Sequence, residues 1–200
     1  MTSDLSPNLN PAQRNYNGVI VLLLINLVVY ILDHPLQLPL NFLYLNHANP
    51  APYQFITSMF CHANWAHLSS NLFMLYIFGR LIEEEEGILG VVSSYLITGL
   101  VANVLSWLLQ PGSIVSLGAS GAVFGLFAVS LLIKLSWEWR RIIEVLVLGQ
   151  FVVSQVLGEI QQLGYADGIN RIAHIGGALA GVVLIVVLRR VVGSSKPSES

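Results

Sequence analysis

Six apolar stretches dominate this chain, and each is about as long as a helix needs to be to cross a membrane. A bilayer core of about 30 Å requires roughly 20 helical residues. Short polar or Gly/Pro-containing segments separate the stretches, which cover residues 16–32, 67–86, 88–109, 119–135, 141–157 and 172–192. Because lipid offers no partners for backbone N–H and C=O groups, such segments cross a membrane as helices. We therefore expect an all-α, polytopic membrane protein with six transmembrane helices.

The composition agrees with a membrane protein and argues against several other classes. Hydrophobic residues make up 54% of the 200 residues and charged residues only 10%, against roughly 25% in soluble domains. No basic patch interleaved with aromatic residues is present, so nucleic-acid binding is not expected. The single cysteine, Cys61, excludes an internal disulfide. It could act as a nucleophile only with a base beside it in space.

The domain organisation is simple. We expect one domain, residues 16–192, between disordered polar tails at 1–15 and 193–200. The first tail lacks the basic-then-apolar order of a secretory signal and the arginine content of a transit peptide. This favours a bacterial inner membrane over an organelle.

Lysine and arginine positions orient the helices, because these residues collect on the cytoplasmic side. Of the 9 Lys and Arg residues, all but Arg171 fall on one side if both termini are cytoplasmic. The long connection 33–65 then lies outside. After Asp33 it carries no Lys, Arg, Asp or Glu but is rich in aromatic residues. Such a segment is expected in the membrane interface, where aromatic rings are favoured.

The fourth stretch opens with Gly-Ala-Ser-Gly at 118–121, which puts Ser120 in the first turn of a helix near the outer face. Free N–H groups and the positive end of the helix dipole at this point can stabilise an oxyanion. Gly121 and Gly125 allow another helix to approach closely. Taken alone, Ser120 is better explained as a helix cap or a packing residue.

The sixth stretch presents His174, Gly177 and Gly181 on one face, because they are spaced i, i+3, i+7. If this face packs against Gly121 and Gly125, His174 comes toward Ser120. An imidazole base beside a hydroxyl nucleophile is the usual pairing for acyl transfer. A lone histidine in such a helix would more often be a packing residue or part of a proton relay.

His67 and Asn71 are i, i+4 neighbours at the start of the second stretch, again near the outer face. Both side chains can donate hydrogen bonds to a developing oxyanion, or they can pair with each other. Convergence of His62, His67 and His174 would permit a metal site, but no H-E-x-x-H spacing exists and the acidic block 83–86 lies at the other face. We expect no metal and no cofactor.

These segments together resemble the rhomboid family of intramembrane serine proteases over residues 52–181. The matching strings are Phe-Cys-His at 60–62, His-x-x-x-Asn at 67–71, Gly-Ala-Ser-Gly at 118–121, and Ala-His-x-x-Gly-x-x-x-Gly at 173–181. The resemblance implies a six-helix rhomboid-like bundle with an interfacial first loop. It also implies a Ser120–His174 dyad, with Ser120 as nucleophile and His174 as general base and acid, and no catalytic carboxylate.

Further roles come from the same resemblance. His67, Asn71 and the backbone N–H of Ser120 would form the oxyanion hole, and the ring of Phe124 would stack on His174. Supporting positions are Gly118, Gly121, Phe124, Gly177 and Gly181. Glu83 resembles a family acid that braces the first loop. The visible departure is Pro-Tyr-Gln at 52–54 in place of the usual Pro-Trp-Arg, which puts the loop's arginine contacts in question.

Three functions compete on this basis. A protease would cut transmembrane segments of other membrane proteins within the lipid bilayer, near the outer face. A non-catalytic rhomboid-like protein would bind membrane clients, but it would need neither Ser120 nor His174. A proton-coupled transporter would predict inverted repeats and a charged relay, and neither is visible. The sequence therefore favours the protease, with client binding as the alternative.

Overall fold

The protein is described by a computed structural model that covers residues 17–110, 112, 114–134, 139–163 and 169–194. The helices are α1 (Asn17–Asp33), α2 (Gln54–Thr57), α3 (Trp65–Leu109), α4 (Ser120–Lys134), α5 (Trp139–Gln161) and α6 (Arg171–Ser194). Two 3-10 turns, η2 (Leu40–Leu43) and η3 (Ser58–Phe60), and two short strands, β1 (Leu45–Asn46) and β2 (Val115–Ser116), complete the fold. The expected tail at 1–15 lies outside the described residues. Residues 193 and 194, expected in the other tail, belong to α6 instead, and residues 195–200 lie outside the described residues.

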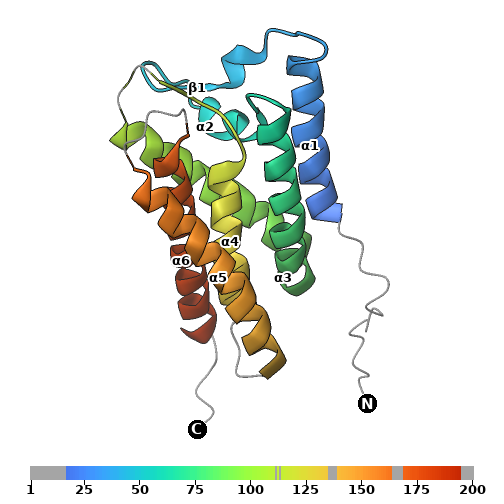
Figure 1. Ribbon diagram of the computed structural model, residues 1–200, viewed down its shortest axis with the longest axis vertical. Helices are drawn as coiled ribbons and strands as arrows, with labels where there is room; N and C mark the ends of the chain where they lie inside the picture. Colours follow the sequence, from blue (N-terminus) through green and yellow to red (C-terminus); the bar gives the residue numbers. More distant parts are fainter. Residues whose placement is uncertain (1–16, 111, 113, 135–138, 164–168, 195–200) are drawn as a thin grey trace.

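Within the described residues, the six predicted apolar stretches are helical nearly throughout. Two of them are joined in α3, whose regular backbone is interrupted at Gly87 with φ 72° and ψ −172°. Glycine adopts a positive φ without the steric cost that other residues have. The helical path can therefore break at Gly87, which separates the two arms of α3. Figure 1 shows the first arm beside α1 and the second arm passing behind α4 toward α6.

Within the part of the chain that the structure describes, two helices are long and apolar enough to cross a membrane by themselves, namely Trp65–Leu109 and Arg171–Val191. The apolar helices Asn17–Asp33, Ser120–Lys134 and Leu146–Gln161 are shorter. The 15 residues of α4 span only about 22 Å at 1.5 Å per residue. Figure 1 accordingly shows α4 starting below the loops that cover that end of the bundle, which leaves Ser120 recessed.

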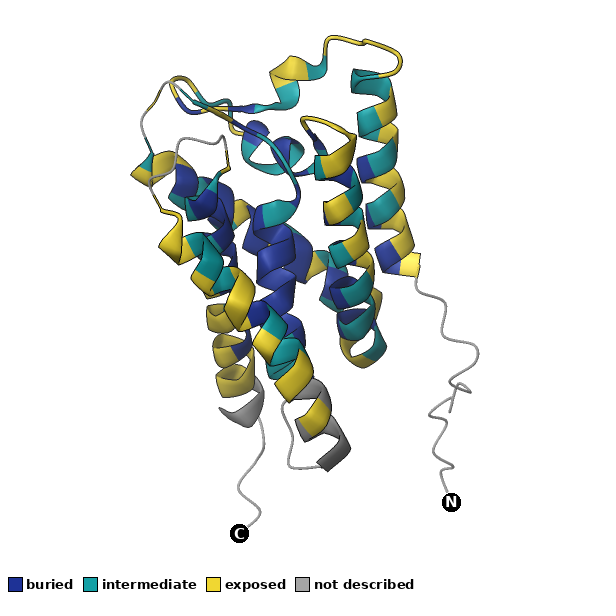
Figure 2. Ribbon diagram, viewed as in Figure 1, coloured by how far each residue is buried: buried dark blue, intermediate teal, exposed yellow. Residues whose placement is uncertain are grey.

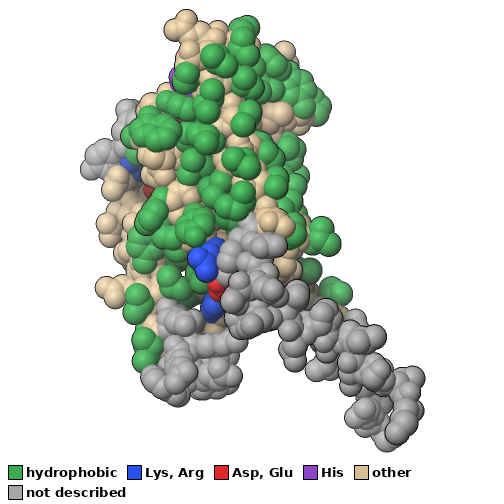
Figure 3. All heavy atoms as spheres, turned by 90° about the vertical axis from the view of Figure 1, so that its right-hand side faces the viewer, with side chains coloured by type: hydrophobic (Ala, Val, Ile, Leu, Met, Phe, Trp, Pro, Cys, Tyr) green, Lys and Arg blue, Asp and Glu red, His purple; other side chains and the backbone are tan. Residues whose placement is uncertain are grey.

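Helix α4 forms the centre of the bundle. Every residue from Gly121 to Ser130 is buried, and Figure 2 shows α4 as the darkest element, enclosed by the others. The outer helices instead expose apolar side chains, for example Leu24 and Val28 of α1 at 52% and 51%. Figure 3 shows hydrophobic side chains over most of one face, with Lys, Arg and acidic side chains near its lower end. An apolar surface of this extent is suited to lipid rather than water.

The first loop between α1 and α3 is compact and tied to the segment before α4. Strand β1 pairs antiparallel with β2, with Leu45 opposite Ser116. Gln54, which stands where the resemblance predicts arginine, is buried. Its side-chain oxygen accepts from the N–H groups of Asn46 and Ala51 at 3.3 and 3.1 Å, and its amide donates to the carbonyl of Phe42 at 2.9 Å. The glutamine thus holds the loop with three hydrogen bonds. The loop's location in the membrane interface stays a prediction.

The expected role of Glu83 is wrong. This buried carboxylate accepts hydrogen bonds from the backbone N–H groups of Gly18 and Val19 at 2.8 and 2.9 Å. It therefore caps the start of α1, at the opposite end of the bundle from the first loop (Figure 1). The physical reason is that the first N–H groups of a helix have no partner within it and attract a negative charge.

Candidate active site

Glycines bring α4 and α6 into backbone contact. A Cβ atom added to Gly177 would overlap the carbonyl oxygen of Gly121, and one added to Gly181 would overlap the carbonyl oxygen of Gly125. The two small-residue faces expected from the sequence therefore pack against each other. This sets the height of His174 on α6 relative to Ser120 on α4.

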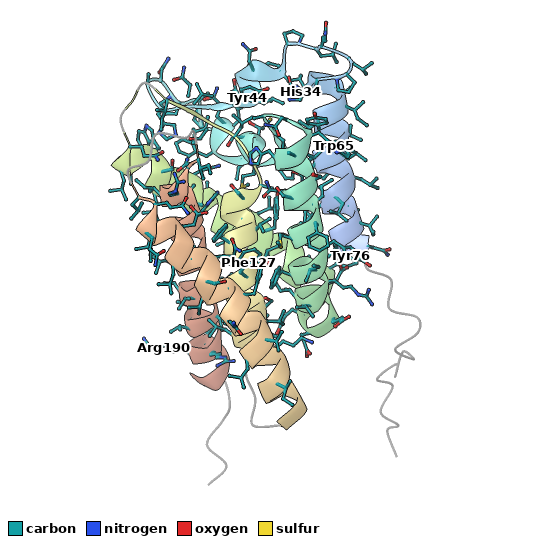
Figure 4. The ribbon with its side chains drawn as sticks, in the orientation of Figure 1. His34, Tyr44, Trp65, Tyr76, Phe127 and Arg190 are labelled. Carbon is teal, nitrogen blue, oxygen red and sulfur yellow. The ribbon has the colours of Figure 1, made fainter. Side chains whose placement is uncertain are left out.

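Ser120 and His174 line the same cavity, which has a volume of about 670 Å³. The cavity reaches from Ala63, in the loop before α3, down to Phe127, which Figure 4 labels in the middle of the bundle. Ser120 is the first helical residue, because the carbonyl of Ala119 accepts the first bond of α4, from Val123 N–H at 2.9 Å. Within the described part of the chain, the Ser120 hydroxyl makes no hydrogen bond, either to His174 or as a helix cap.

Two histidines shape the turn that precedes Ser120. Nε2 of His62 accepts the N–H of Ala119 at 3.3 Å. Gly118 has φ 128°, and a Cβ there would lie 2.7 Å from Cε1 of His67, so only glycine fits. Burial, with a smaller effect from the neighbouring His67, lowers the pKa of His62 to about 3. The ring is therefore neutral and can accept the Ala119 N–H.

The predicted oxyanion donors also lie on this cavity. His67 and Asn71 line it from the first arm of α3. The amide of Asn71 donates to the backbone carbonyl of His67 at 2.8 Å, so the two side chains do not bond to each other. A carboxamide has two N–H donors, which leaves one for the cavity. The N–H of Ser120 belongs to the first turn of α4, where amides have no partner within the helix.

The ring of His174 is held on two sides. Phe124 stacks on it with ring centroids 4.6 Å apart and planes at 7°. On its edge, Nδ1 lies 3.0 Å from Oε1 of Glu159. That distance would allow a hydrogen bond, but the direction of the ring N–H does not meet the angle that a hydrogen bond requires. The two side chains are therefore in close contact without an aligned hydrogen bond.

Glu159 is a residue that the sequence analysis missed. The fifth stretch was expected to end at 157, but α5 continues to Gln161 and carries Glu159 toward α6. The resemblance implied a dyad without a catalytic carboxylate, but a carboxylate from the fifth stretch stands beside His174. The available signal was spacing: Gln155 and Glu159, four residues apart, form one polar face on an otherwise apolar segment.

Glu159 also accounts for Arg171, the one cation expected on the outer side. Arg171 is 4% exposed, and its Nε lies 3.7 Å from Oε2 of Glu159. Its guanidinium also donates to the side-chain oxygen of Gln162 at 2.9 Å. A buried cation needs such partners to offset its loss of hydration.

Cys61 does not belong to the cavity. Its side chain is fully buried and its thiol faces the carbonyl of Thr57 at 3.5 Å. Burial raises the pKa of Cys61 to about 12, so the thiolate that a nucleophile requires is scarce at neutral pH. Among the described residues, no group of three or more His, Cys, Asp and Glu side chains is arranged to hold a metal ion.

The apolar helices and their exposed apolar side chains are those of a membrane protein. The model of the Rhomboid domain matches residues 49–191, and the chain belongs to the rhomboid family. It is 53% identical to the chloroplastic Rhomboid-like protein 11 of Arabidopsis thaliana, over 94% of this chain and 71% of that protein.

Two further relatives are more distant. The mitochondrial RHOMBOID-like protein 6 of Arabidopsis thaliana is 34% identical over 68% of this chain and 43% of its own length. Rhomboid-like protease 3 of Toxoplasma gondii is 37% identical over 65% of this chain and 49% of its own length. The chain thus spans less than half of these two proteins. The organellar names of the two plant relatives give no support to the bacterial inner membrane expected from the sequence.

Proposed function

We propose that this protein is an intramembrane serine endopeptidase that cuts transmembrane segments of other membrane proteins near the outer face of the bilayer. Ser120 is the nucleophile, and His174 is the general base and acid. The observation that carries the proposal is the shared cavity, which is lined both by a serine at a helix start and by a histidine stacked on Phe124. Membership of the rhomboid family and the protease name of the Toxoplasma relative support it.

The proposed topology has six spans with both termini in the cytoplasm. It is supported by the helical character of all six apolar stretches and by the break at Gly87. The described chain also begins and ends at the same end of the bundle, opposite the first loop (Figure 1). The positions of lysine and arginine put that end in the cytoplasm.

The reaction runs in two acyl-transfer steps. His174 removes the proton of the Ser120 hydroxyl as its oxygen attacks a peptide carbonyl of the substrate. The oxyanion accepts hydrogen bonds from Asn71, His67 and the Ser120 N–H, each typically worth about 3–4 kcal/mol in the transition state. His174 then donates the proton to the leaving amine. Water, deprotonated by His174, hydrolyses the acyl-enzyme and restores Ser120.

A fluorophosphonate probe tests this proposal, because it reacts covalently with an activated serine hydroxyl. We expect labelling of the wild-type protein and none of Ser120→Ala or His174→Ala. Ser130→Ala is the matched control, since Ser130 is a buried serine of the same helix whose hydroxyl donates to the backbone carbonyl of Phe127 at 3.0 Å. This variant should label like the wild type.

Cleavage of a model transmembrane substrate in liposomes should follow the same pattern. Persistent cleavage by Ser120→Ala would exclude Ser120 as the nucleophile. No labelling of a wild-type protein that unfolds cooperatively, in detergent and in lipid, would instead favour the client-binding function.

A further inference from the structure

We propose that Glu159 is a positioning residue for His174, so that the Ser120–His174 pair works with a third, carboxylate member delivered by α5. This inference rests on the proposed function. It starts from the 3.0 Å separation between Nδ1 of His174 and Oε1 of Glu159. The carboxylate lies on the same cavity as Ser120 and His174.

The contact is buried, which makes it strong enough to matter. The side chains of His174 and Glu159 are 11% and 16% exposed. Charges that are largely shielded from water interact more strongly than exposed pairs, whose net contribution is small. The electrostatic interaction between the carboxylate and the imidazole ring is therefore only weakly screened by water.

The chemical effect follows from which ring nitrogen faces the carboxylate. A carboxylate beside Nδ1 accepts a hydrogen bond from an Nδ1–H group and so stabilises the tautomer with hydrogen on Nδ1. The lone pair then lies on Nε2, the nitrogen left to take the Ser120 proton. During attack the ring becomes a cation, which the negative charge of Glu159 stabilises. In this role Glu159 does not take the proton that His174 removes from Ser120, and it forms no bond to substrate.

The surrounding charges hold the carboxylate in place. Arg171 approaches its other oxygen, Oε2, at 3.7 Å and is itself bonded to Gln162, also on α5. Among the described residues, His67 from α3 is a further titratable group that interacts with His174. The N–H of His174 is not aligned with the carboxylate, so the ring or the carboxylate must rotate to form a full hydrogen bond. Catalytic hydrogen bonds often tighten only with substrate bound.

The simplest rival is that Glu159 only neutralises the buried Arg171. Glu159→Gln keeps the size of the side chain but removes the charge that both roles need, and the readouts separate them: loss of the Arg171 partner lowers stability, whereas loss of positioning lowers kcat and changes the His174 tautomer. We expect kcat for cleavage of a model transmembrane substrate, and the rate of fluorophosphonate labelling, to fall about 10- to 100-fold with KM unchanged. Glu159→Asp, which restores the charge on a shorter stem, should recover part of the loss.

Ser154→Ala is the matched control, since Ser154 is an exposed polar residue of the same helix α5 that lies away from the lining of the cavity and donates to the carbonyl of Phe151 at 2.7 Å. It should leave kcat near the wild-type value. A second readout does not depend on activity: ¹⁵N NMR of imidazole-labelled protein should show His174 with hydrogen on Nδ1 in the wild type. Glu159→Gln should convert this to a mixture of tautomers.

The outcomes separate this inference from the proposed function. A Glu159→Gln variant that unfolds normally and keeps wild-type kcat overturns the inference while leaving Ser120 and His174 in their roles. An unchanged His174 tautomer also overturns it. A wild-type protein that does not label at Ser120 overturns the proposed function first, and the tautomer measurement then still decides whether Glu159 orients the ring.

Discussion

Gly177 of α6 lies so close to the backbone carbonyl of Gly121 in α4 that no Cβ atom fits between them. Ser120 precedes Gly121 by one residue, and His174 precedes Gly177 by one helical turn. This backbone contact therefore sets the register of the two helices that carry the proposed nucleophile and base.

Alanine at Gly177 should force α4 and α6 apart. Overpacking of this kind costs about 1–3 kcal/mol of the free energy of unfolding, and more where the obstacle is backbone. We expect Gly177→Ala to unfold at a clearly lower temperature in detergent and to lose fluorophosphonate labelling, because His174 moves away from Ser120.

Gly158→Ala is the control for this prediction. Gly158 is also helical, but a Cβ there meets nothing within 4 Å. Alanine at an unhindered helical position is favourable by about 0.5–1 kcal/mol over glycine. Equal melting temperatures for Gly177→Ala and wild type would contradict the close contact.

His62 makes the fold sensitive to acid. Its folded-state pKa is lowered to about 3, whereas an unfolded histidine titrates near about 6.5. Between these pH values the unfolded chain binds a proton that the folded one does not, so the free energy of unfolding falls as the pH drops below about 6.5. The loss from His62 should reach about 2 kcal/mol at pH 5.

Thermal unfolding of wild type and His62→Gln between pH 7 and pH 5 checks this, because glutamine retains an acceptor for the Ala119 N–H but does not titrate. The variant should lose less stability over that range. His67 and His34 lie next to His62 in both proteins, so their contributions cancel in the comparison. Identical pH slopes would show that His62 is not held neutral.

Glu83 should contribute to stability through the start of α1. Glu83→Gln keeps one acceptor oxygen for the N–H groups of Gly18 and Val19 but removes the second oxygen and the charge. We expect a loss of about 1–3 kcal/mol, the range for a buried, charge-assisted hydrogen bond. Glu86→Gln, an exposed position in the same acidic block, should change the melting temperature little. Equal effects of both substitutions would argue that only total charge matters.

Cys61 should resist alkylation in the folded protein. Its side chain is fully buried, and burial raises its pKa to about 12, so both access and thiolate are lacking. Mass spectrometry should find no maleimide adduct on the native protein at neutral pH and one adduct after unfolding. Rapid modification of native protein, or loss of labelling at Ser120 in Cys61→Ala, would give the thiol a role that the structure does not.

The sequence by itself determined the helical segments, the break at Gly87 and the placement of Ser120 at a helix start. These features depend on local properties: the length of an apolar run, the freedom of glycine at positive φ, and the unpaired N–H groups of a first turn. The spacing of His174, Gly177 and Gly181 likewise predicted one helix face. The cavity that Ser120, His174, His67 and Asn71 share follows from these faces.

Only the tertiary structure decided which distant groups meet. It put Glu159 beside His174, Glu83 at the start of α1, and His62 on the N–H of Ala119. The sequence could not reveal these contacts, because periodicity reports which face a residue occupies on its own helix, not which helix packs against that face. A helix end misjudged by one turn was enough to hide Glu159, since the last turn of α5 is what brings its carboxylate to the histidine.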